Sequence, residues 1–370
     1  MFFGLFYGFS CKLDATMHDY CFTIEKESSK SLARCGTLQT PHGAIETPTF
    51  MPVGTAATVK SLTVEQVAAT ESQILLANTY HLALRPGIDV IKQHGGLHQF
   101  MQWDKPILTD SGGYQVFSLA KRRKIDAEGV TFQSHIDGSK VRFTPESVID
   151  LQLGFNSDIM MILDICTAYG ATKKQTASDM KITHQWARQA RDYWEQAAVP
   201  NWCFAIVQGG FYEELRQESV EALAAMNFPG YAIGGLSVGE PEDMLHEYIA
   251  KVAPLLPKDK PRYVMGIGLP ENIKVAIEHG VDMFDCVVPT RIARHGQFFC
   301  NEKRVNIKLE KFKFSLEPLE EGCGCYTCQH YTKSYLRHLF VAKEMLAATL
   351  LSIHNIYALQ QVVKRCKDKL

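Results

Sequence analysis

Eight short apolar runs, each ending in small or polar residues, constrain the fold of this chain more than any other feature. They occupy residues 50–54, 74–78, 106–110, 159–164, 203–208, 231–235, 263–266 and 283–285. Short apolar runs of this kind are typical of strands that are buried on both faces of a sheet. Helical spacing separates several of them, at residues 145–152, 181–197, 213–226 and 271–278, and Thr144 is positioned to cap the first of these helices.

The alternation of eight strands with helices predicts an α/β fold, a (β/α)8 TIM barrel. A chain of 370 residues is long enough for one such barrel with additions. The alternative is an open doubly wound sheet, but the sequence contains no G-x-G-x-x-G turn to support it.

Polar side chains stand at the ends of the predicted strands. Because the active sites of TIM barrels lie at the C-terminal ends of the strands, these residues should meet at one mouth. A lone aspartate at such a position is most often a turn former, whereas three at matching strand ends indicate a catalytic or binding site. The strand ends carry Asn78, Asp110, Asp164, Gln208, Gly234, Gly235, Met265 and Asp285.

Composition narrows the possible partners. The formal net charge is −1, so a nucleic-acid substrate would have to be bound by a local basic patch. No apolar run approaches the roughly 18–20 residues needed to cross a bilayer, and we expect no membrane association. The apolar start lacks the basic segment and cleavage site of a signal peptide, so we expect a cytoplasmic protein with residues 1–16 as an N-terminal extension.

Three of the eleven cysteines, Cys323, Cys325 and Cys328, fall within six residues. This density favours a metal site over a disulfide framework, and three thiolates with one histidine would fill a tetrahedral Zn²⁺ shell. Such a zinc would be structural, with no open position for water. Spacing alone leaves the fourth ligand open between His354 and His338, which both lie in helical patterns, while His330 is too close in sequence to complete the shell easily.

Together with this cysteine motif, three segments resemble bacterial tRNA-guanine transglycosylases. They are residues 109–117 (TDSGGYQVF), 234–240 (GGLSVGE) and 284–291 (FDCVVPTR), and the resemblance runs from about residue 20 to the C-terminus. The resemblance implies a barrel with an inserted zinc-binding subdomain and selects His354 as the fourth ligand. We expect a catalytic barrel over residues 17–305, a zinc-binding subdomain over 306–355, and a helical end over 356–370 that packs on the barrel.

The resemblance also implies an activity, the exchange of the wobble guanine of tRNAs with a G-U-N anticodon for a 7-deazaguanine base. Asp285 matches the nucleophile of the family and Asp110 its general acid/base. Asp164 matches the residue that reads the base, because a carboxylate can accept hydrogen bonds from both the ring N–H and the amino group of guanine. The other residues expected to contact the base are Gln208, Gly235, Leu236, Tyr114, Met265, Cys166, Val238, Glu240 and Asn78.

Cations near the mouth should bind tRNA phosphates, and the family is usually homodimeric. Arg291 and Arg294 follow the expected nucleophile, and a basic run follows them. Ile165 stands where bacterial members usually have glutamate, which raises queuine as an alternative to preQ1 as the incoming base. Two other functions remain, a non-catalytic tRNA-binding partner subunit and a nucleoside or glycoside hydrolase on the same barrel. The basic run comprises Lys303, Arg304, Lys308, Lys311 and Lys313.

Overall fold

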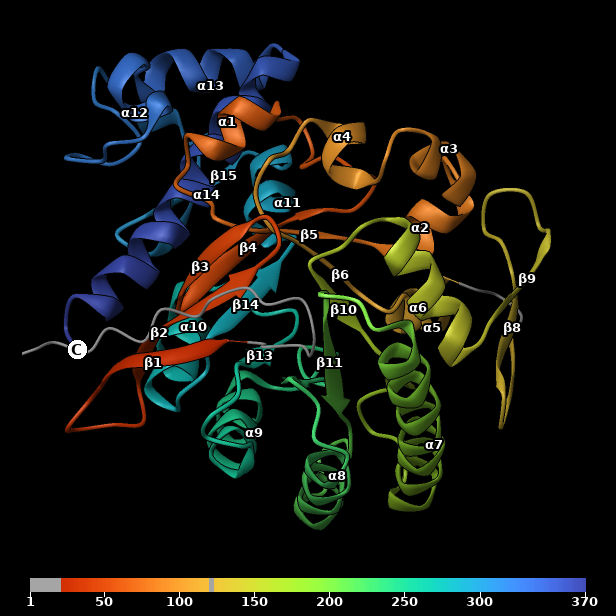
Figure 1. The fold of residues 1–370 in the computed structure, drawn as a ribbon. Helices are drawn as coiled ribbons and strands as arrows, with labels where there is room; N and C mark the ends of the chain where they lie inside the picture. Colours follow the sequence, from red (N-terminus) through yellow and green to blue (C-terminus); the bar gives the residue numbers. More distant parts are fainter. Residues whose placement is uncertain (1–20, 120–122) are drawn as a thin grey trace, which may run out of the picture.

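The computed structural model describes residues 21–119 and 123–370, so the extension expected at residues 1–16 lies outside the described residues. Eight parallel strands form a closed barrel, which confirms the predicted fold class (Figure 1). Each barrel strand coincides with one of the eight apolar runs. In chain order they are β4 (Thr49–Gly54), β5 (Leu75–Ala77), β6 (Ile107–Thr109), β10 (Ile159–Met161), β11 (Trp202–Val207), β12 (Gly230–Ile233), β13 (Arg262–Val264) and β14 (Met283–Cys286).

Helices link successive barrel strands and surround the barrel (Figure 1). Thr144 caps α6 as expected, because its side chain accepts a hydrogen bond from the Ser147 amide. The prediction for α7 was wrong at its start, which lies eight residues before Lys181, because the first two turns are largely polar and lack apolar spacing. The linking helices are α1 (Val64–Ala68), α2 (Thr79–Leu84), α3 (Ile88–Gln93), α4 (Leu97–Met101), α5 (Gly113–Leu119), α6 (Pro145–Gly154), α7 (Lys173–Ala197), α8 (Glu213–Ala225), α9 (Glu242–Val252), η1 (Ala253–Leu255) and α10 (Pro270–Glu278). A further helix, α11 (Val288–Arg294), follows the last barrel strand.

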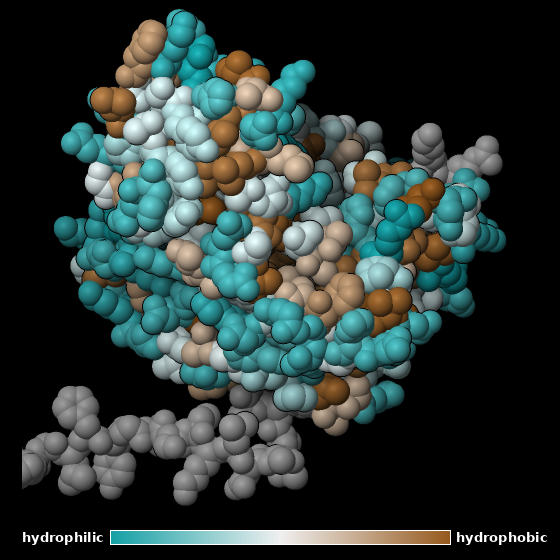
Figure 2. Space-filling model, turned by 90° about the horizontal axis from the view of Figure 1, so that it is seen from above, coloured by the Kyte–Doolittle hydropathy of each residue, from teal (hydrophilic) through white to brown (hydrophobic). Residues whose placement is uncertain are grey.

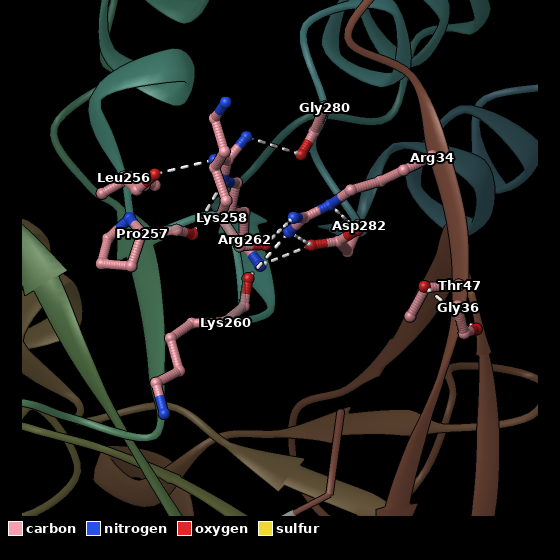
Figure 3. A network of polar contacts seen from close by, with 10 residues as sticks. All are labelled: Arg34, Gly36, Thr47, Leu256, Pro257, Lys258, Lys260, Arg262, Gly280 and Asp282. Atoms are coloured by element: carbon pink, nitrogen blue, oxygen red, sulfur yellow. Dashed lines mark hydrogen bonds and ion pairs between the residues drawn. The ribbon is translucent and has the colours of Figure 1, made fainter. Parts of the chain in front are cut away.

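A three-stranded antiparallel sheet covers the N-terminal end of the barrel. It consists of β1 (Phe22–Glu27), β2 (Arg34–Thr40) and β3 (Gly43–Thr47). Figure 3 shows the guanidinium of Arg34 reaching Asp282, which precedes β14. The two side chains form a buried ion pair, with 2.6 Å between Nη2 and Oδ2. Asp282 also accepts a hydrogen bond from the Arg262 backbone amide. The sheet therefore closes one end of the barrel.

Two insertions extend from the barrel, and the sequence analysis predicted no strands in either. A three-stranded sheet of β7 (Arg123–Asp126), β8 (Gly129–Gln133) and β9 (Lys140–Phe143) lies between α5 and α6. The second insertion follows α11 and begins with the hairpin of β15 (Gln297–Cys300) and β16 (Lys303–Asn306). It continues through η2 (Glu310–Phe312), α12 (Tyr326–His330) and α13 (Lys333–Val341).

The last helix, α14 (Met345–Lys367), returns from the second insertion to the barrel. Its Gln360 side chain donates hydrogen bonds to the Phe50 carbonyl on β4 and to the Ser72 hydroxyl. On the molecular face shown in Figure 2, hydrophobic residues stand among hydrophilic ones. In the described part of the chain, no helix combines the length and apolarity required to span a membrane.

Candidate active site and metal centre

The three aspartates predicted at the strand ends lie at the C-terminal end of the barrel. Asp110 directly follows β6, Asp285 is the third residue of β14, and Asp164 lies three residues beyond β10. They are close enough that the negative charges of Asp285 and Asp164 both raise the pKa of Asp110. The structure therefore brings the expected nucleophile, acid/base and base reader to one site.

Asp110 is 8% exposed and is held by a ring of donors. Its Oδ1 accepts hydrogen bonds from the amides of Thr79 at 3.0 Å and Gly112 at 3.1 Å. Its Oδ2 accepts one from the side-chain amide of Asn78 at 2.5 Å, so Asn78 orients this carboxylate. Burial is the main cause that raises the pKa of Asp110 to about 7, which suits a group that both gives and takes a proton near neutral pH.

Asp285 has one occupied and one free carboxylate oxygen. Its Oδ1 accepts hydrogen bonds from the Tyr263 hydroxyl at 2.5 Å and from the Gly266 amide at 2.8 Å. No described residue donates a hydrogen bond to Oδ2, and the residue is partly exposed. Burial raises the pKa of Asp285, and the bonds from Tyr263 and Gly266 lower it. The arrangement fixes the carboxyl plane and leaves Oδ2 available to a reacting atom.

Asp164 and Gln208 form one polar wall of the site. The Gln208 side-chain amide donates to Asp164 Oδ2 at 2.7 Å, and the Ser111 hydroxyl donates to Oδ1 at 3.0 Å. Burial raises the pKa of Asp164 to about 6, so the group is ionised at neutral pH. The Gln208 Oε1 atom is buried and has no protein partner among the described residues, which marks it as an acceptor for a ligand.

The remaining residues expected at the base surround this wall. Tyr114, on α5, is 52% exposed, whereas Met265, directly after β13, is partly buried. The Glu240 carboxylate accepts hydrogen bonds from the amides of Ser237 and Val238, which fixes the loop after β12. Burial raises the pKa of Cys166 to about 12, so this thiol stays protonated.

Ile165, which stands where the sequence analysis expected a glutamate, does not line the site. Its side chain is fully buried in an apolar cluster with Tyr80, Val116 and Trp186. The neighbouring carboxylate of Asp164 faces the opposite way, toward Gln208. The replacement of the usual glutamate by isoleucine therefore changes the packing behind the pocket wall.

Sequence reasoning missed several residues that hold the site together. Tyr263, on β13, contacts Asp285, and Ser111 contacts Asp164. The Arg216 side chain, on α8, donates to the backbone carbonyls of Gly234 and Gly235. Only the motif that contains Ser111 gave any signal, because the other two residues lie within ordinary strand and helix patterns.

The expected phosphate-binding cations fall on different elements. Arg291 and Arg294 lie on α11, immediately after β14, and the Arg294 Nη1 atom is buried without a partner among the described residues. Burial and the nearby charge of Arg291 lower the pKa of Arg294. Lys303 and Arg304 lie exposed on β16, and Lys308 is exposed beyond it. The structure thus groups the two arginines next to the site and places the basic run on the second insertion.

A metal centre can form where the second insertion meets α14. The Nδ1 atom of His354 lies 3.7, 3.5 and 3.3 Å from the sulfurs of Cys323, Cys325 and Cys328. Sulfur and nitrogen ligands of one tetrahedral Zn²⁺ lie about 3.6 Å apart, so the four residues fit this ion. His354 Nε2 bonds the Phe299 carbonyl at 2.6 Å, which orients the ring toward the sulfurs. The competing His338 is exposed and is not part of the cluster.

A second group of possible ligands, His42, His98 and Asp158, lies at the N-terminal end of the barrel. The two imidazole rings are stacked, with centroids 3.5 Å apart and planes inclined by 14°. Nitrogen lone pairs in stacked rings run side by side and do not converge on one ion. Asp158 instead accepts hydrogen bonds from the His42 ring and amide, which attaches the β2–β3 turn to the barrel floor.

Comparisons with known proteins find one family over most of the chain. A family model described as "Queuine tRNA-ribosyltransferase" matches residues 28–370. Proteins named queuine tRNA-ribosyltransferase from Dictyoglomus turgidum and Desulforapulum autotrophicum are 49% identical over 350 residues and 52% identical over 336 residues. These alignments cover 94% and 91% of this chain, and 90% and 91% of the relatives. A protein of the same name from Acinetobacter baylyi is 49% identical over 351 residues, with 95% and 91% coverage.

Proposed function

The chain belongs to the queuine tRNA-ribosyltransferase family, and on this premise we propose that it exchanges the wobble guanine of G-U-N tRNAs for a 7-deazaguanine. The observation that carries the proposal is the convergence of Asp285, Asp110 and Asp164 at one end of the barrel. The family and the names of its members support a transferase that acts on guanine in tRNA.

The first step follows from the free oxygen of Asp285. Departure of guanine builds positive charge at C1′ of the ribose, and Asp285 Oδ2 attacks this carbon. A C–O bond to the carboxylate forms as the C1′–N9 bond to guanine breaks. The tRNA strand stays intact because no phosphodiester bond takes part. Meanwhile Oδ1 keeps its hydrogen bonds from Tyr263 and Gly266, which hold the carboxyl group in place.

Asp110 transfers the proton in both halves of the reaction. With a pKa raised to about 7 by burial, it is partly protonated near neutral pH and can protonate the departing guanine. It then takes the N9 proton of the incoming base, which attacks C1′ and releases Asp285. Two displacements at the same carbon keep the configuration of the ribose.

The base is recognised by groups that the site leaves open. The ionised Asp164 accepts from N1–H and the amino group of guanine, while Gln208 and the amides of Gly235 and Leu236 serve the other edge. Tyr114 and Met265 cover the two faces of the ring, and stacking of this kind is worth about 1–3 kcal/mol per base. The target nucleotide must leave the anticodon-loop stack to enter the pocket.

Partner binding and metal binding complete the proposal. Arg291 and Arg294 bind phosphates beside the pocket, and the basic run from Lys303 extends this contact. One structural Zn²⁺ held by the Cys₃His cluster stabilises the second insertion and takes no part in the chemistry. We further propose a cytoplasmic homodimer, supported by exposed apolar side chains in and after the insertion, among them Phe314 and Met345.

The first test is incorporation of labelled guanine into unmodified tRNA with a G-U-N anticodon. Exchange without loss of base supports the proposal, whereas release of guanine with an abasic tRNA would identify a hydrolase. No incorporation by folded, zinc-loaded protein would favour a non-catalytic partner subunit. A parallel chase with preQ1 and with queuine identifies the incoming base as the one that displaces guanine more efficiently.

The second test concerns the nucleophile. Asp285→Asn keeps an oxygen for the bonds from Tyr263 and Gly266 but removes the attacking carboxylate. We expect no covalent adduct with tRNA on a denaturing gel and no base exchange. Asp259→Asn, which changes an exposed carboxylate before β13, should form the adduct normally. Exchange at the wild-type rate by Asp285→Asn would show that another residue attacks the ribose.

A further inference from the structure

The loop after β12 presents two buried backbone donors that no protein oxygen in the described part of the chain accepts. The Ser237 and Val238 amides donate to Glu240, and the Gly235 amide faces the Cys166 thiol. The Leu236 amide has no acceptor among the described residues. Gly235 is buried and Leu236 is 4% exposed. Buried N–H groups are nearly always paired in proteins, and a thiol is only a weak acceptor, so both donors are available to a ligand.

Arg216 determines the direction of these donors. Arg216 is 1% exposed, and its Nη1 donates to the Gly234 carbonyl at 2.7 Å while Nη2 donates to the Gly235 carbonyl at 3.3 Å. In a planar trans peptide the C=O and the following N–H point in opposite directions. Carbonyls turned toward Arg216 therefore turn the amides of Gly235 and Leu236 away from it.

The same side chain ties this loop to the neighbouring strand. Arg216 Nε donates to the Gly210 carbonyl at 2.7 Å and Nη1 to the Val207 carbonyl at 3.0 Å. Val207 and Gly210 flank Gln208, the residue that contacts Asp164. A Cβ added to Gly235 would lie 2.6 Å from Gln208 Oε1, so the glycine backbone and the glutamine side chain are in direct contact. One guanidinium thus fixes both halves of the wall around the base pocket.

We propose that Arg216 is a positioning residue that selects a base with an oxygen acceptor beside its N1–H, because it aims the Gly235 and Leu236 amides at that oxygen. The inference rests on the proposed function. In guanine, O6 is the acceptor next to N1–H. With Asp164 on N1–H and the amino group, the oriented amides meet O6. No carboxylate pairs with Arg216 in the described structure, so four carbonyl oxygens carry its charge-assisted bonds.

Arg216→Lys tests the proposal, and Arg262→Lys is its matched control. Lysine keeps the charge but donates from a single atom, which cannot reach the carbonyls of both Gly210 and Gly235. Arg262 is also a buried arginine with backbone carbonyl partners, those of Leu256, Pro257 and Gly280, at the opposite end of the barrel (Figure 3). Both substitutions should lower Tm, and only Arg216→Lys should weaken base binding.

The readouts are KM for guanine, KM for tRNA and kcat, together with equilibrium binding of guanine and of 6-thioguanine. We expect KM and Kd for guanine to rise about tenfold in Arg216→Lys, with KM for tRNA unchanged. A tenfold loss of affinity corresponds to the loss of about one hydrogen bond. 6-Thioguanine keeps N1–H and the amino group but replaces O6 by sulfur, a weaker acceptor. Its Kd should therefore rise much less.

The outcomes separate this inference from the proposed function. Equal losses for guanine and 6-thioguanine, or an unchanged Kd for guanine, would overturn the role of Arg216 while exchange by the wild type stands. If the wild-type protein neither exchanges nor binds guanine, both the role of Arg216 and the proposed function are wrong. If Arg216→Lys does not fold, Arg216→Gln, which lacks the positive charge but still donates from one amide nitrogen, carries the same comparison.

Discussion

Individual contacts at the site explain how ordinary residues acquire special roles. Asp285 is one carboxylate among many in the chain, yet two donors on Oδ1 leave Oδ2 as its only free oxygen. Asp110 and Asp164 are both buried, and their pKa values are raised to about 7 and about 6. Between these values Asp164 is largely ionised while Asp110 is largely protonated, so acceptor and acid coexist at one pH.

Removal of the Tyr263 hydroxyl should slow the chemistry and leave tRNA binding intact. Tyr263→Phe keeps the ring and leaves Asp285 Oδ1 with a single donor, the Gly266 amide. Because this bond helps to orient and stabilise the carboxylate, we expect kcat to fall about tenfold or more with KM for tRNA unchanged. Single-turnover exchange measures the effect. Equal kcat values for the variant and the wild type would contradict it.

Replacement of Asp164 should stabilise the fold at alkaline pH while it abolishes base exchange. The folded-state pKa is raised from 3.8 to about 6, so the cost of the buried charge is absent below pH 4 and complete above pH 6. Asp164→Asn avoids this cost and can still bond Ser111 and Gln208. The stability of Asp164→Asn relative to wild type should therefore increase from pH 4 to pH 8, by at most about 3 kcal/mol in unfolding free energy, and its Tm should rise accordingly.

Thermal unfolding of both proteins between pH 4 and pH 8 gives this comparison. If the difference in Tm between the two proteins does not depend on pH, ionisation of Asp164 does not destabilise the folded protein. The loss of exchange has a separate origin, since asparagine presents a donor where guanine also presents one.

At the scale of elements, the sequence predicted the barrel strands well and the additional sheets poorly. Strands such as β11 and β12 are buried throughout, so their apolar runs stand out from the sequence. β1 and β7 are largely exposed and carry mixed residues, which give no strand signal. The residues that position the site, Tyr263 and Arg216, were missed because their partners are backbone groups and side chains on other elements.

The fourth zinc ligand could not be chosen from spacing, since His338 and His354 both lie on helices. His354→Ala removes the only nitrogen ligand, and we expect zinc affinity to fall at least about 100-fold and Tm to drop. His338→Ala changes an exposed side chain and should retain about one zinc per chain. Elemental analysis after dialysis against a chelator decides the matter, and equal zinc contents in the two variants would exclude His354.

In the whole molecule, one end of the barrel is built to bind a ligand and the other is closed. The C-terminal end keeps unpaired groups for a ligand, whereas the N-terminal end is closed by the ion pair of Arg34 and Asp282. Arg34→Met leaves the Asp282 carboxylate buried without its cation, which should cost about 3–5 kcal/mol in unfolding free energy. The exposed pair of Arg142 and Asp126 is the control, and Arg142→Met should have a much smaller effect, because solvent screens this pair.

Urea denaturation measures both costs. Guanine binding by the folded fraction of Arg34→Met should equal that of wild type, because the ion pair lies at the opposite end of the barrel from the pocket. Similar free-energy losses in the two variants would mean that closure of the barrel floor contributes little to stability.

The path of α14 has a consequence for the synthesis of this protein. The helix ends at residue 367, and it binds β4, which ends at residue 54, through Gln360. The strand β4 also pairs with β14, whose residues begin at 283. During translation the first barrel strand therefore keeps one edge open until most of the chain has left the ribosome. The barrel cannot close before β14 has been synthesised, and a nascent chain stalled before residue 283 would expose this edge to chaperones or to other chains.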